Sequence, residues 1–217
     1  MSSIEYVDFG FSEEETKRPL QDSYRDSLIE TFQEVFTVEN SPYDEDWSYE
    51  AVDDFLDKTE NKDYKGTIAF DTQTEEVVGF TWGYRVDPKQ VNIDEKFPEE
   101  LDDIDTEVYD GETFMIDEVG VDPEYRRRGI GRSLEQSLLQ KLQQDDQISR
   151  AMQRTQWSGE NIPKLQLDYE LGFDPFTYSD GVAEKPVLQE VPFVGKTGGD
   201  ERVYIGKDLE SLSGELE

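Results

Sequence analysis

The chain of 217 residues is long enough for one domain, and its 53 Asp and Glu against 21 Lys and Arg give a formal net charge of −32. Because phosphate backbones and anionic membrane surfaces must be met by clustered cations, this charge argues strongly against a general nucleic-acid binder or a protein that docks on such membranes. The chain has no Cys and no His, which excludes disulfides, thiolate nucleophiles, Cys-ligated zinc and imidazole bases.

The first half of the chain contains five predicted elements. Alternating apolar and polar residues predict strands, and apolar residues spaced three and four apart predict helices. In chain order these are a strand over 4–9, helices over 20–36 and 48–56, and strands over 66–71 and 77–86. Ser48 is the expected N-cap of the second helix, and the polar stretch 72–76 joins the last two strands as a hairpin.

An acid-rich insertion over residues 87–112 follows these strands. It contains Pro88 and Pro98, and its few apolar residues are scattered without a period. A loop of this length inside a compact domain is usually functional or mobile. We therefore expect the insertion to contribute to function.

The second half of the chain continues the mixture of strands and helices. Its predicted elements are a strand over 113–121, a helix over 131–144, a strand over 148–156, a helix over 161–171, and closing strands over 187–194 and 202–207. Pro163 in the first turn and Gly172 at the C-terminal end suit the helix over 161–171. Residues 210–217 are expected to form a flexible tail. The whole chain, 1–217, is predicted to be a single domain without an internal repeat.

The aromatic content indicates that this acidic chain folds. High net charge with low hydrophobicity is a signature of disorder, but 12% of the residues are aromatic and the acids are spread from end to end. We therefore predict a folded domain with an acidic surface, typical of a salt-accumulating halophile of the haloarchaeal type. At molar salt the Debye length is about 3 Å, so self-repulsion is screened. Loss of far-UV circular dichroism at low salt would support this prediction, and full structure there would count against it.

One segment goes against the acidic trend. Four arginines lie within seven residues around two glycines, between a predicted strand and a predicted helix: Arg126, Arg127, Arg128, Arg132, Gly129 and Gly131. Glycines let the backbone turn tightly, a helix start offers free N–H donors, and arginines add charge and bidentate contacts to oxygen. This combination predicts an anion site. The alternative is a solvated basic patch that balances nearby acids.

The same segment carries a family resemblance. The run Arg126-Arg-Arg-Gly129-Ile-Gly131, with its lead-in Val121-Asp-Pro-Glu-Tyr, resembles the Arg/Gln-x-x-Gly-x-Gly/Ala signature of the GNAT superfamily of N-acetyltransferases. A second block near the C-terminus resembles the family at Asn161, Pro163, Leu167, Gly172 and Phe173, and residues 202–209 resemble its closing strand. The resemblance covers about residues 66–209.

The resemblance implies an α/β (α+β) fold and a cofactor. It implies a central mixed, mostly antiparallel twisted sheet of six to seven strands with splayed central strands, flanked by about four helices, and acetyl-CoA as co-substrate without a metal. The pantetheine arm would bond to backbone groups of the splayed strand, and the diphosphate would bind to backbone N–H groups of the turn. The implied cofactor-binding residues are Val119, Val121, Arg126, Arg127, Arg128, Gly129, Ile130, Gly131, Arg132 and Asn161.

Acetyl transfer to an amine needs a base for the ammonium and an acid for the departing thiolate. In the family a carboxylate near the end of the splayed strand often acts as base, and Asp117 and Glu118 are the candidates here. Because side chains alternate along a strand, Asp117 shares the face of Val121 and Glu118 points the other way, so we prefer Asp117. The family's frequent acid is a tyrosine at the position of Asp168. Tyr169, one place later, is a candidate, and water is an alternative.

The resemblance implies an N-acetyltransferase that transfers the acetyl group of acetyl-CoA to a primary amine by direct attack in a ternary complex. The acceptor would be a small molecule or a protein N-terminus, with the insertion over 87–112 shaping the choice. Alternatives are a catalytically silent acyl-CoA-binding or regulatory module, favoured by Asp168 at the tyrosine position, and an acidic, histone-mimicking interaction protein.

Expectations about partners and location follow from the same sequence. No nucleic acid or membrane is expected as a partner, and a homodimer stays open. No apolar run approaches the roughly 18 residues of a spanning helix, and the N-terminus lacks the basic-then-apolar pattern of a signal peptide. We therefore expect a cytoplasmic location.

Overall fold

The computed structural model describes residues 4–10, 12–13, 16–17, 22–36, 47–60, 64–86, 113–156, 162–175, 177–179, 184–186, 188–192 and 199–209. These residues belong to two compact units, Met1–Tyr84 with Asp117–Lys141 and Arg85–Ile116 with Leu142–Glu217. The insertion over 87–112, Asn161 and the tail over 210–217 lie outside the described residues. A single domain over 1–217 stays a prediction.

The first unit is built on antiparallel strands. In the order in which they pair, these are β1 (Ile4–Phe9), β4 (Tyr64–Asp71), β5 (Glu76–Val86) and β6 (Thr113–Val121), of which residues 117–121 belong to this unit. The predicted hairpin turn joins β4 to β5, and Asp71 holds it: its carbonyl accepts the N–H of Glu75 at 2.8 Å and its Oδ1 accepts that of Gln73 at 2.9 Å. A short pair of strands, β2 (Ser12–Glu13) and β3 (Thr16–Lys17), also belongs to this unit.

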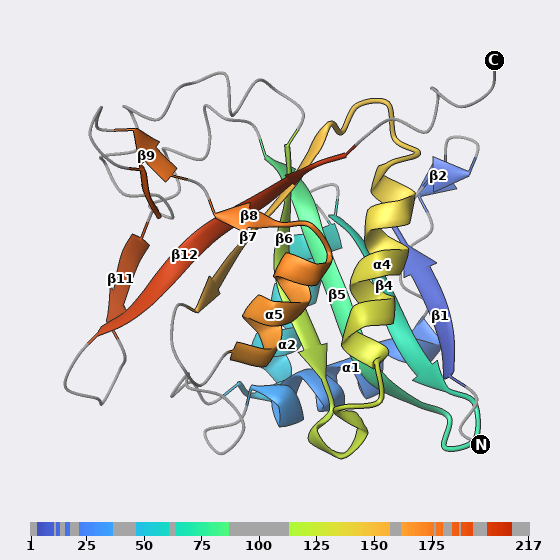
Figure 1. The fold of residues 1–217 in the computed structure, drawn as a ribbon. Helices are drawn as coiled ribbons and strands as arrows, with labels where there is room; N and C mark the ends of the chain where they lie inside the picture. The colour runs from blue at the N-terminus through green and yellow to red at the C-terminus, as the bar shows by residue number, and fades with distance from the viewer. Residues whose placement is uncertain are drawn as a thin grey trace. The chain divides into compact units, whose positions relative to one another are not determined.

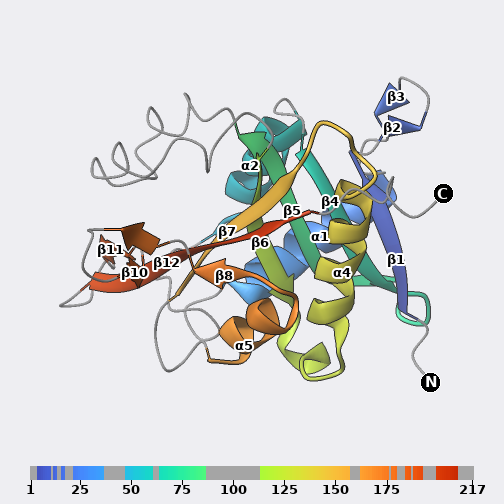
Figure 2. The ribbon, with the colours of Figure 1, turned by 45° about the horizontal axis from the view of Figure 1, so that its top comes forward.

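Three helices cover the two faces of these strands. They are α1 (Asp22–Val35), α2 (Tyr49–Glu60) and α4 (Ile130–Leu142). Helices α1 and α2 pack on one face, where Phe32 stacks on Phe80 and Trp82 with ring centroids 5.5 and 5.8 Å apart. Helix α4 packs on the opposite face through Ile130 and Leu134, and Figures 1 and 2 show it across β4 and β5 from α1. Burying an aromatic side chain of this size contributes about 1.5–3 kcal/mol, so the Phe32 cluster anchors the unit.

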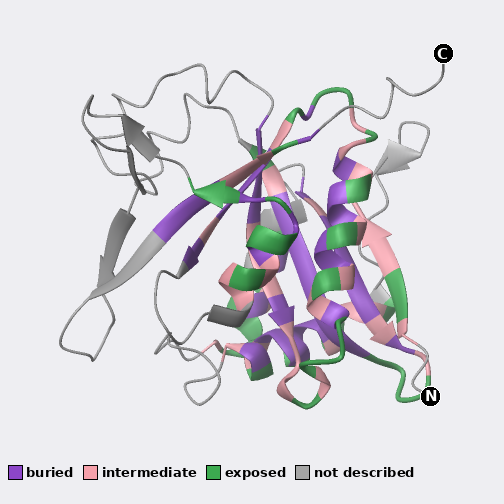
Figure 3. Ribbon diagram, in the orientation of Figure 1, coloured by how far each residue is buried: buried purple, intermediate pink, exposed green. Residues whose placement is uncertain are grey.

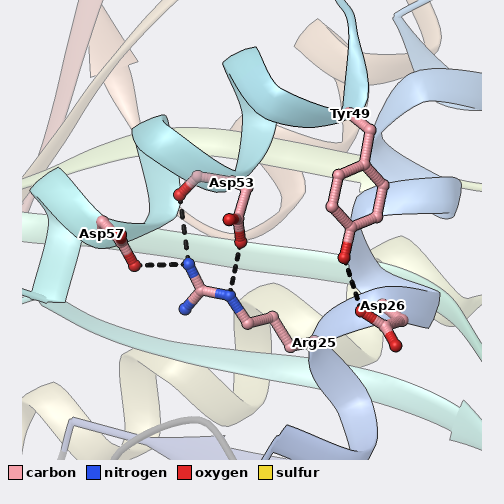
Figure 4. Close-up of polar contacts among 5 residues, drawn as sticks. All are labelled: Arg25, Asp26, Tyr49, Asp53 and Asp57. Atoms are coloured by element: carbon pink, nitrogen blue, oxygen red, sulfur yellow. Dashed lines mark hydrogen bonds and ion pairs between the residues drawn. The ribbon is translucent and has the colours of Figure 1, made fainter.

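Polar contacts join α1 to α2 outside this core. Arg25 Nε donates to Asp53 Oδ1 at 2.7 Å, and its Nη2 donates to Asp57 Oδ1 at 2.5 Å (Figure 4). The hydroxyl of Tyr49 donates to Asp26 Oδ1 at 2.6 Å. Ser48 caps α2 as predicted, because its Oγ accepts the N–H of Ala51 at 3.2 Å. These contacts are partly exposed, so each ion pair adds at most about 1 kcal/mol and sets helix position more than stability.

The second unit pairs strands in both directions. Residues 113–116 of β6 pair in parallel with β7 (Arg150–Gln156), and this ladder stops short of the ends of both strands. The antiparallel partners that follow are β12 (Gly199–Asp208), β11 (Leu188–Pro192) and β8 (Asp174–Pro175), with a separate hairpin of β9 (Thr177–Ser179) and β10 (Glu184–Pro186). Helix α5 (Ile162–Glu170) belongs to this unit, and Gly172, whose φ is 85°, follows its C-terminal end.

The predicted fold class is confirmed. Among the described residues, seven strands of mixed and mostly antiparallel pairing are flanked by four α-helices, and Figure 3 shows the buried residues along β4 and β5. The strand over 113–121 matches its prediction residue for residue, and α4 begins one residue earlier and ends two residues earlier than predicted. The two- and three-residue strands were missed, because so short a segment carries no period. No described helix is long and apolar enough to cross a membrane.

Candidate functional site

A short 3₁₀ helix, η3 (Pro123–Tyr125), starts the turn between β6 and α4. Asp122 caps η3, because its Oδ1 accepts the N–H of Glu124 at 2.7 Å and its carbonyl accepts the N–H of Tyr125 at 2.8 Å. The Asp-Pro pair therefore ends β6 sharply and leads the chain into the arginine cluster. We call residues 122–132 the arginine turn.

The backbone of the arginine turn passes twice through the left-handed region. Arg127 has a φ of 61° and Gly129 a φ of 83°. Glycine adopts this conformation without a steric penalty, which accounts for Gly129. A Cβ atom built on Gly129 would meet no atom within 4 Å, so the space beside this residue is open. The turn therefore presents its backbone to an open side.

The start of α4 adds N–H donors to this open side. The first helical bond runs from Ser133 N–H to the carbonyl of Gly129 at 3.0 Å. The N–H groups of Ile130, Gly131 and Arg132 precede it, so the helix itself gives them no acceptor. The first turn of α4 contains no acidic residue, and the positive end of the helix dipole lies here. This arrangement suits an anion.

Two of the arginine side chains also brace the turn. Arg126 Nε donates to the carbonyl of Val121 at 3.0 Å, and Arg128 Nη2 donates to the carbonyl of Glu124 at 2.8 Å. The guanidinium of Arg128 also lies 4.7 Å from the ring centroid of Tyr125. Both arginines are exposed, so their charge stays at the surface beside the free N–H groups.

A buried carboxylate ties the arginine turn to the β4–β5 hairpin. The hydroxyl of Tyr125 donates to Asp71 Oδ2 at 3.2 Å, and Asp71 is only 3% exposed. The pKa of Tyr125 lies above its ordinary value: a hydrogen bond from Thr74 lowers it, but burial and the contact with Asp71 raise it more. The contact between these two residues was not predicted, although an acid that ends a strand before a turn was an available signal.

The strand that leads into the turn places the two predicted carboxylates on opposite faces. A Cβ atom on Gly120 would lie 2.4 Å from the ring of Phe80, so Gly120 faces the α1–α2 side. Val121 packs on the α4 side. By alternation from these two residues, Asp117 is expected on the α4 face and Glu118 on the face of Phe80. Both carboxylates are half-buried.

Tyr64, which is paired with Tyr84, lies within electrostatic reach of both carboxylates. Tyr64 and Tyr84 are register partners on β4 and β5, with ring centroids 5.1 Å apart. Burial raises the pKa of Tyr64 well above its usual range, and Asp117, Tyr84 and Glu118 raise it further because each repels a phenolate. Tyr64 and Tyr84 pack against the core cluster of Phe80 and Trp82 on the α1–α2 side.

Helix α5, in the second unit, carries the acid candidate Tyr169 and, one residue earlier, Asp168 at the family's tyrosine position. Asp168 is 1% exposed, whereas Tyr169 is 73% exposed. Gln153 Nε2 donates to Asp168 Oδ1 at 2.8 Å, Lys164 Nζ pairs with the same oxygen, and Lys164 also donates to Gln153 Oε1 at 3.0 Å. We call Gln153, Lys164 and Asp168 the buried cluster. Sequence reasoning missed Lys164, although its i, i+4 spacing to Asp168 was an available signal.

The first unit thus brings together most of the predicted site. Residues from Val119 to Arg132 form one continuous strand and turn, preceded by Asp117 and Glu118. Tyr169 belongs to the second unit, and Asn161 is outside the described residues. Within the ranges described above, no group of three or more Asp and Glu residues is placed to hold a metal ion.

Comparisons with known proteins agree with the family resemblance found in the sequence. The family model for the acetyltransferase (GNAT) family matches residues 30–163. A comparison with curated proteins gave no match.

Solved structures resemble the chain in fold. One structure, which is described as an acetyltransferase of Acinetobacter baylyi ADP1, is 14% identical to this chain and has a TM-score of 0.65. The match covers 100% of this chain and 97% of the other. The protein yncA from Salmonella typhimurium, with its cofactor acetyl-CoA, is 12% identical with a TM-score of 0.60, covering 95% and 94%. The ribosomal-protein-S18-alanine N-acetyltransferase from Escherichia coli is 16% identical with a TM-score of 0.57, covering 100% and 99%.

Proposed function

The chain belongs to the acetyltransferase (GNAT) family of acetyl-CoA-dependent acyltransferases, and we propose that it transfers the acetyl group to a primary amine by direct attack in a ternary complex. The observation that carries this proposal is the arginine turn, which collects exposed cations and the N–H groups of a helix start in a chain of net charge −32. CoA carries a diphosphate and a further phosphate. Such oxyanions are the ligands that helix N-termini and guanidinium groups bind best.

The geometry of β6 supports binding of the pantetheine arm of the cofactor along the strand and of its diphosphate at the turn. We assign the diphosphate to the N–H groups of residues 129–132. Asp122 N–H donates to Val78 at 3.1 Å, so it points toward β5. Since successive N–H groups point to opposite edges of a strand, those of Val121 and Val119 point away from β5, where the amides of a pantetheine arm would find them.

Asp117 is our candidate for the base. In the proposed step Asp117 takes a proton from the acceptor ammonium, directly or through water. The freed nitrogen lone pair forms a bond to the thioester carbonyl carbon, and the carbon–sulfur bond breaks with its electron pair left on sulfur. The nitrogen loses its second proton to water, so that a neutral amide forms. The departing thiolate then takes a proton. Tyr169, which is exposed on α5, stays the side-chain candidate for that proton, with water as the alternative.

The acceptor is proposed to be a cationic amine. The half-buried carboxylates of Asp117 and Glu118 support this choice, because they favour an ammonium over a neutral or anionic group. A small amine and a protein N-terminus both satisfy this requirement, and the Escherichia coli structural neighbour is named for an alanine of ribosomal protein S18.

We also propose the cellular conditions in which the protein works. The excess of 32 negative charges supports work in a salt-rich cytoplasm, where the repulsion between surface acids is screened. The same excess opposes nucleic acid and anionic membranes as partners. A homodimer is compatible with the family assignment, and size-exclusion chromatography with light scattering in molar KCl would decide it.

Thiol release from acetyl-CoA against a panel of amines in molar KCl tests the proposal. We expect at least one cationic amine to raise the rate, and Asp117→Asn to lower turnover about 100-fold without changing acetyl-CoA affinity, because general-base catalysis typically contributes that much or more. Glu118→Gln is the matched control and should stay near the wild-type rate. Wild-type turnover in Asp117→Asn across pH would remove Asp117 from the mechanism, and a panel without any active amine would refute the transfer.

A further inference from the structure

Asp71 is a buried carboxylate that the proposed mechanism does not use. It ends β4 and is only 3% exposed, in register with Ile4 on β1 and with Glu76 on β5. Within the described part of the chain no arginine or lysine pairs with it, so hydrogen bonds alone compensate its charge. Because burying an ionised carboxylate without a cation costs free energy, the charge of Asp71 requires an explanation.

The β4–β5 hairpin does not require a charge at this position. Asp71 Oδ1 accepts the N–H of Gln73 at 2.9 Å, and the side-chain oxygen of an asparagine closes the same kind of turn. The N–H of Glu75 donates to the backbone carbonyl of Asp71, which any residue supplies. The hairpin therefore uses one side-chain oxygen, and an asparagine would serve it without the cost of a buried charge.

The second carboxylate oxygen serves the arginine turn instead. Asp71 Oδ2 accepts the hydroxyl of Tyr125 at 3.2 Å, whereas an asparagine has one side-chain oxygen and an NH₂ donor in place of the other. The ring of Tyr125 packs against the cluster of Ile130 and Leu134 in α4 and lies 4.7 Å from the guanidinium of Arg128. The carboxylate therefore fixes a side chain that contacts both the turn and the helix that follows it.

We propose that Asp71 is a positioning residue of the cofactor site, whose second carboxylate oxygen holds Tyr125, and with it the arginine turn, in the conformation that binds acetyl-CoA. The inference rests on the proposed function and deepens it, because it adds a residue of β4, outside the turn, to those that determine affinity. In this role Asp71 acts through Tyr125 and does not contact the ligand. Its charge alone would weaken the binding of an anion, so a positioning role predicts the opposite effect when the charge is removed.

Asp71→Asn tests the proposal, because it keeps an acceptor for the hairpin and removes the acceptor of Tyr125. We expect the dissociation constant for acetyl-CoA, measured by calorimetry in molar KCl, to rise about threefold to fivefold, since the lost hydrogen bond is worth about 1 kcal/mol. A dissociation constant equal to that of the wild type, or below it, would overturn the inference.

Asp8 provides a matched control in the same unit. Its half-buried carboxylate also accepts hydroxyl groups, from Thr67 at 2.8 Å and from Ser137 at 3.3 Å, and its Oδ2 lies 3.4 Å from the ammonium of Lys141. These contacts join β1 to β4 and α4 without the arginine turn. Asp8→Asn should lower the melting temperature about as much as Asp71→Asn, by about 2–4 °C, and keep the affinity within about twofold of the wild type. Equal losses of affinity in both variants would overturn the inference, because lost stability would then account for them.

Amide hydrogen exchange in the wild type follows the same connection without a substitution. If Asp71 couples the turn to the hairpin, saturation with acetyl-CoA should slow exchange about threefold at Gln73 and Glu75, whose N–H groups Asp71 accepts. Gln147 is the reference amide, because its N–H donates to Asp145 Oδ1 at 3.0 Å in a similar turn of the second unit. Exchange at Gln73 and Glu75 that does not respond to the ligand would overturn the inference, even if Asp71→Asn fails to fold.

The outcomes that overturn the inference differ from those that overturn the proposed function. The slowing at the hairpin should vanish in Tyr125→Phe, and its persistence there would show that the phenol does not carry the coupling. Normal binding by the wild type, with wild-type affinity in Asp71→Asn, would overturn the inference alone. A wild-type protein that does not bind acetyl-CoA would refute the proposed function, and the inference with it.

Discussion

The arginine turn and the buried cluster handle positive charge in opposite ways. In the turn, three consecutive arginines are exposed beside N–H groups that the helix leaves free. In the cluster, Lys164 is paired with a carboxylate that is 1% exposed and that also accepts from Gln153. A cation kept at the surface of so acidic a protein indicates a ligand, whereas a cation paired with a buried acid serves the fold. Substitutions in the arginine turn should therefore mainly change the affinity for acetyl-CoA, and substitutions in the buried cluster should mainly change the stability of the protein.

The largest expected effect is on affinity, at Gly129. Gly129→Asp places a carboxylate on the open side of the turn, where the free N–H groups of α4 lie, and should weaken acetyl-CoA binding at least about 100-fold by calorimetry. Gly172→Asp is the matched control, because Gly172 has a similar φ of 85° at the end of α5. It should lower the melting temperature and leave affinity unchanged. Equal losses of affinity in both variants would mean that backbone strain, not the anion site, is responsible.

The next effect is on stability, in the buried cluster. Asp168→Asn removes the buried carboxylate that pairs with the ammonium of Lys164, which should cost about 3 kcal/mol of unfolding free energy and lower the melting temperature by about 6–12 °C. Glu170→Gln, an exposed change two residues later in the same helix, should shift it by no more than about 1–2 °C. At temperatures where the Asp168→Asn variant is folded, its affinity for acetyl-CoA should match the wild type. A large loss of affinity would show that the buried cluster contributes to ligand binding and would contradict the distinction between the two regions.

The two regions also differ in how well the sequence predicted them. The arginine turn is local: its glycines, its Pro123 and the strand before it are adjacent in the chain, so their residue types alone indicate the turn and the helix that follows. The cluster depends on a bond between Gln153 on β7 and Asp168 on α5, 15 residues apart, and on how that helix packs. A helix period shows that Asp168 lies one turn from Lys164, but it does not show that this face is buried.

The same limit explains the missed anchor of the turn. Tyr125 and Asp71 are 54 residues apart, and only the pairing of β4, β5 and β6 brings them together. Alternation along β6, by contrast, was enough to place Asp117 and Glu118 on opposite faces. Short-range periodicity therefore predicted the elements and the side-chain faces, and the tertiary hydrogen bonds required the structure.

An intermediate effect is expected where the turn meets the hairpin. Tyr125→Phe removes one hydrogen bond to a buried carboxylate, worth about 1 kcal/mol, so the melting temperature should fall by about 2–4 °C. Because the same bond positions the turn, affinity for acetyl-CoA should also fall, by about threefold to fivefold. Asp71→Asn and the double variant complete a thermodynamic cycle. Additive losses of affinity in the double variant would show that the two side chains do not act together.

The smallest effect appears only at high pH. The pKa of Tyr64 is raised in the folded protein, so the neutral phenol is favoured there and its stabilisation is complete below the unfolded value of about 10. As pH rises above that value toward the folded pKa, this contribution is lost. Urea unfolding at pH 7 and at pH 11 should show a smaller decline for Tyr64→Phe than for the wild type. Parallel declines would mean that burial and the nearby acids do not perturb Tyr64.

The central claim is that the arginine turn binds the diphosphate of acetyl-CoA through its backbone. Titrating ¹⁵N-labelled protein with acetyl-CoA in molar KCl, while following the amide resonances, tests it most directly. We predict that the largest saturable shifts belong to Gly129, Ile130, Gly131 and Arg132. Saturation accompanied by shifts elsewhere, with these four amides unmoved, would contradict the account.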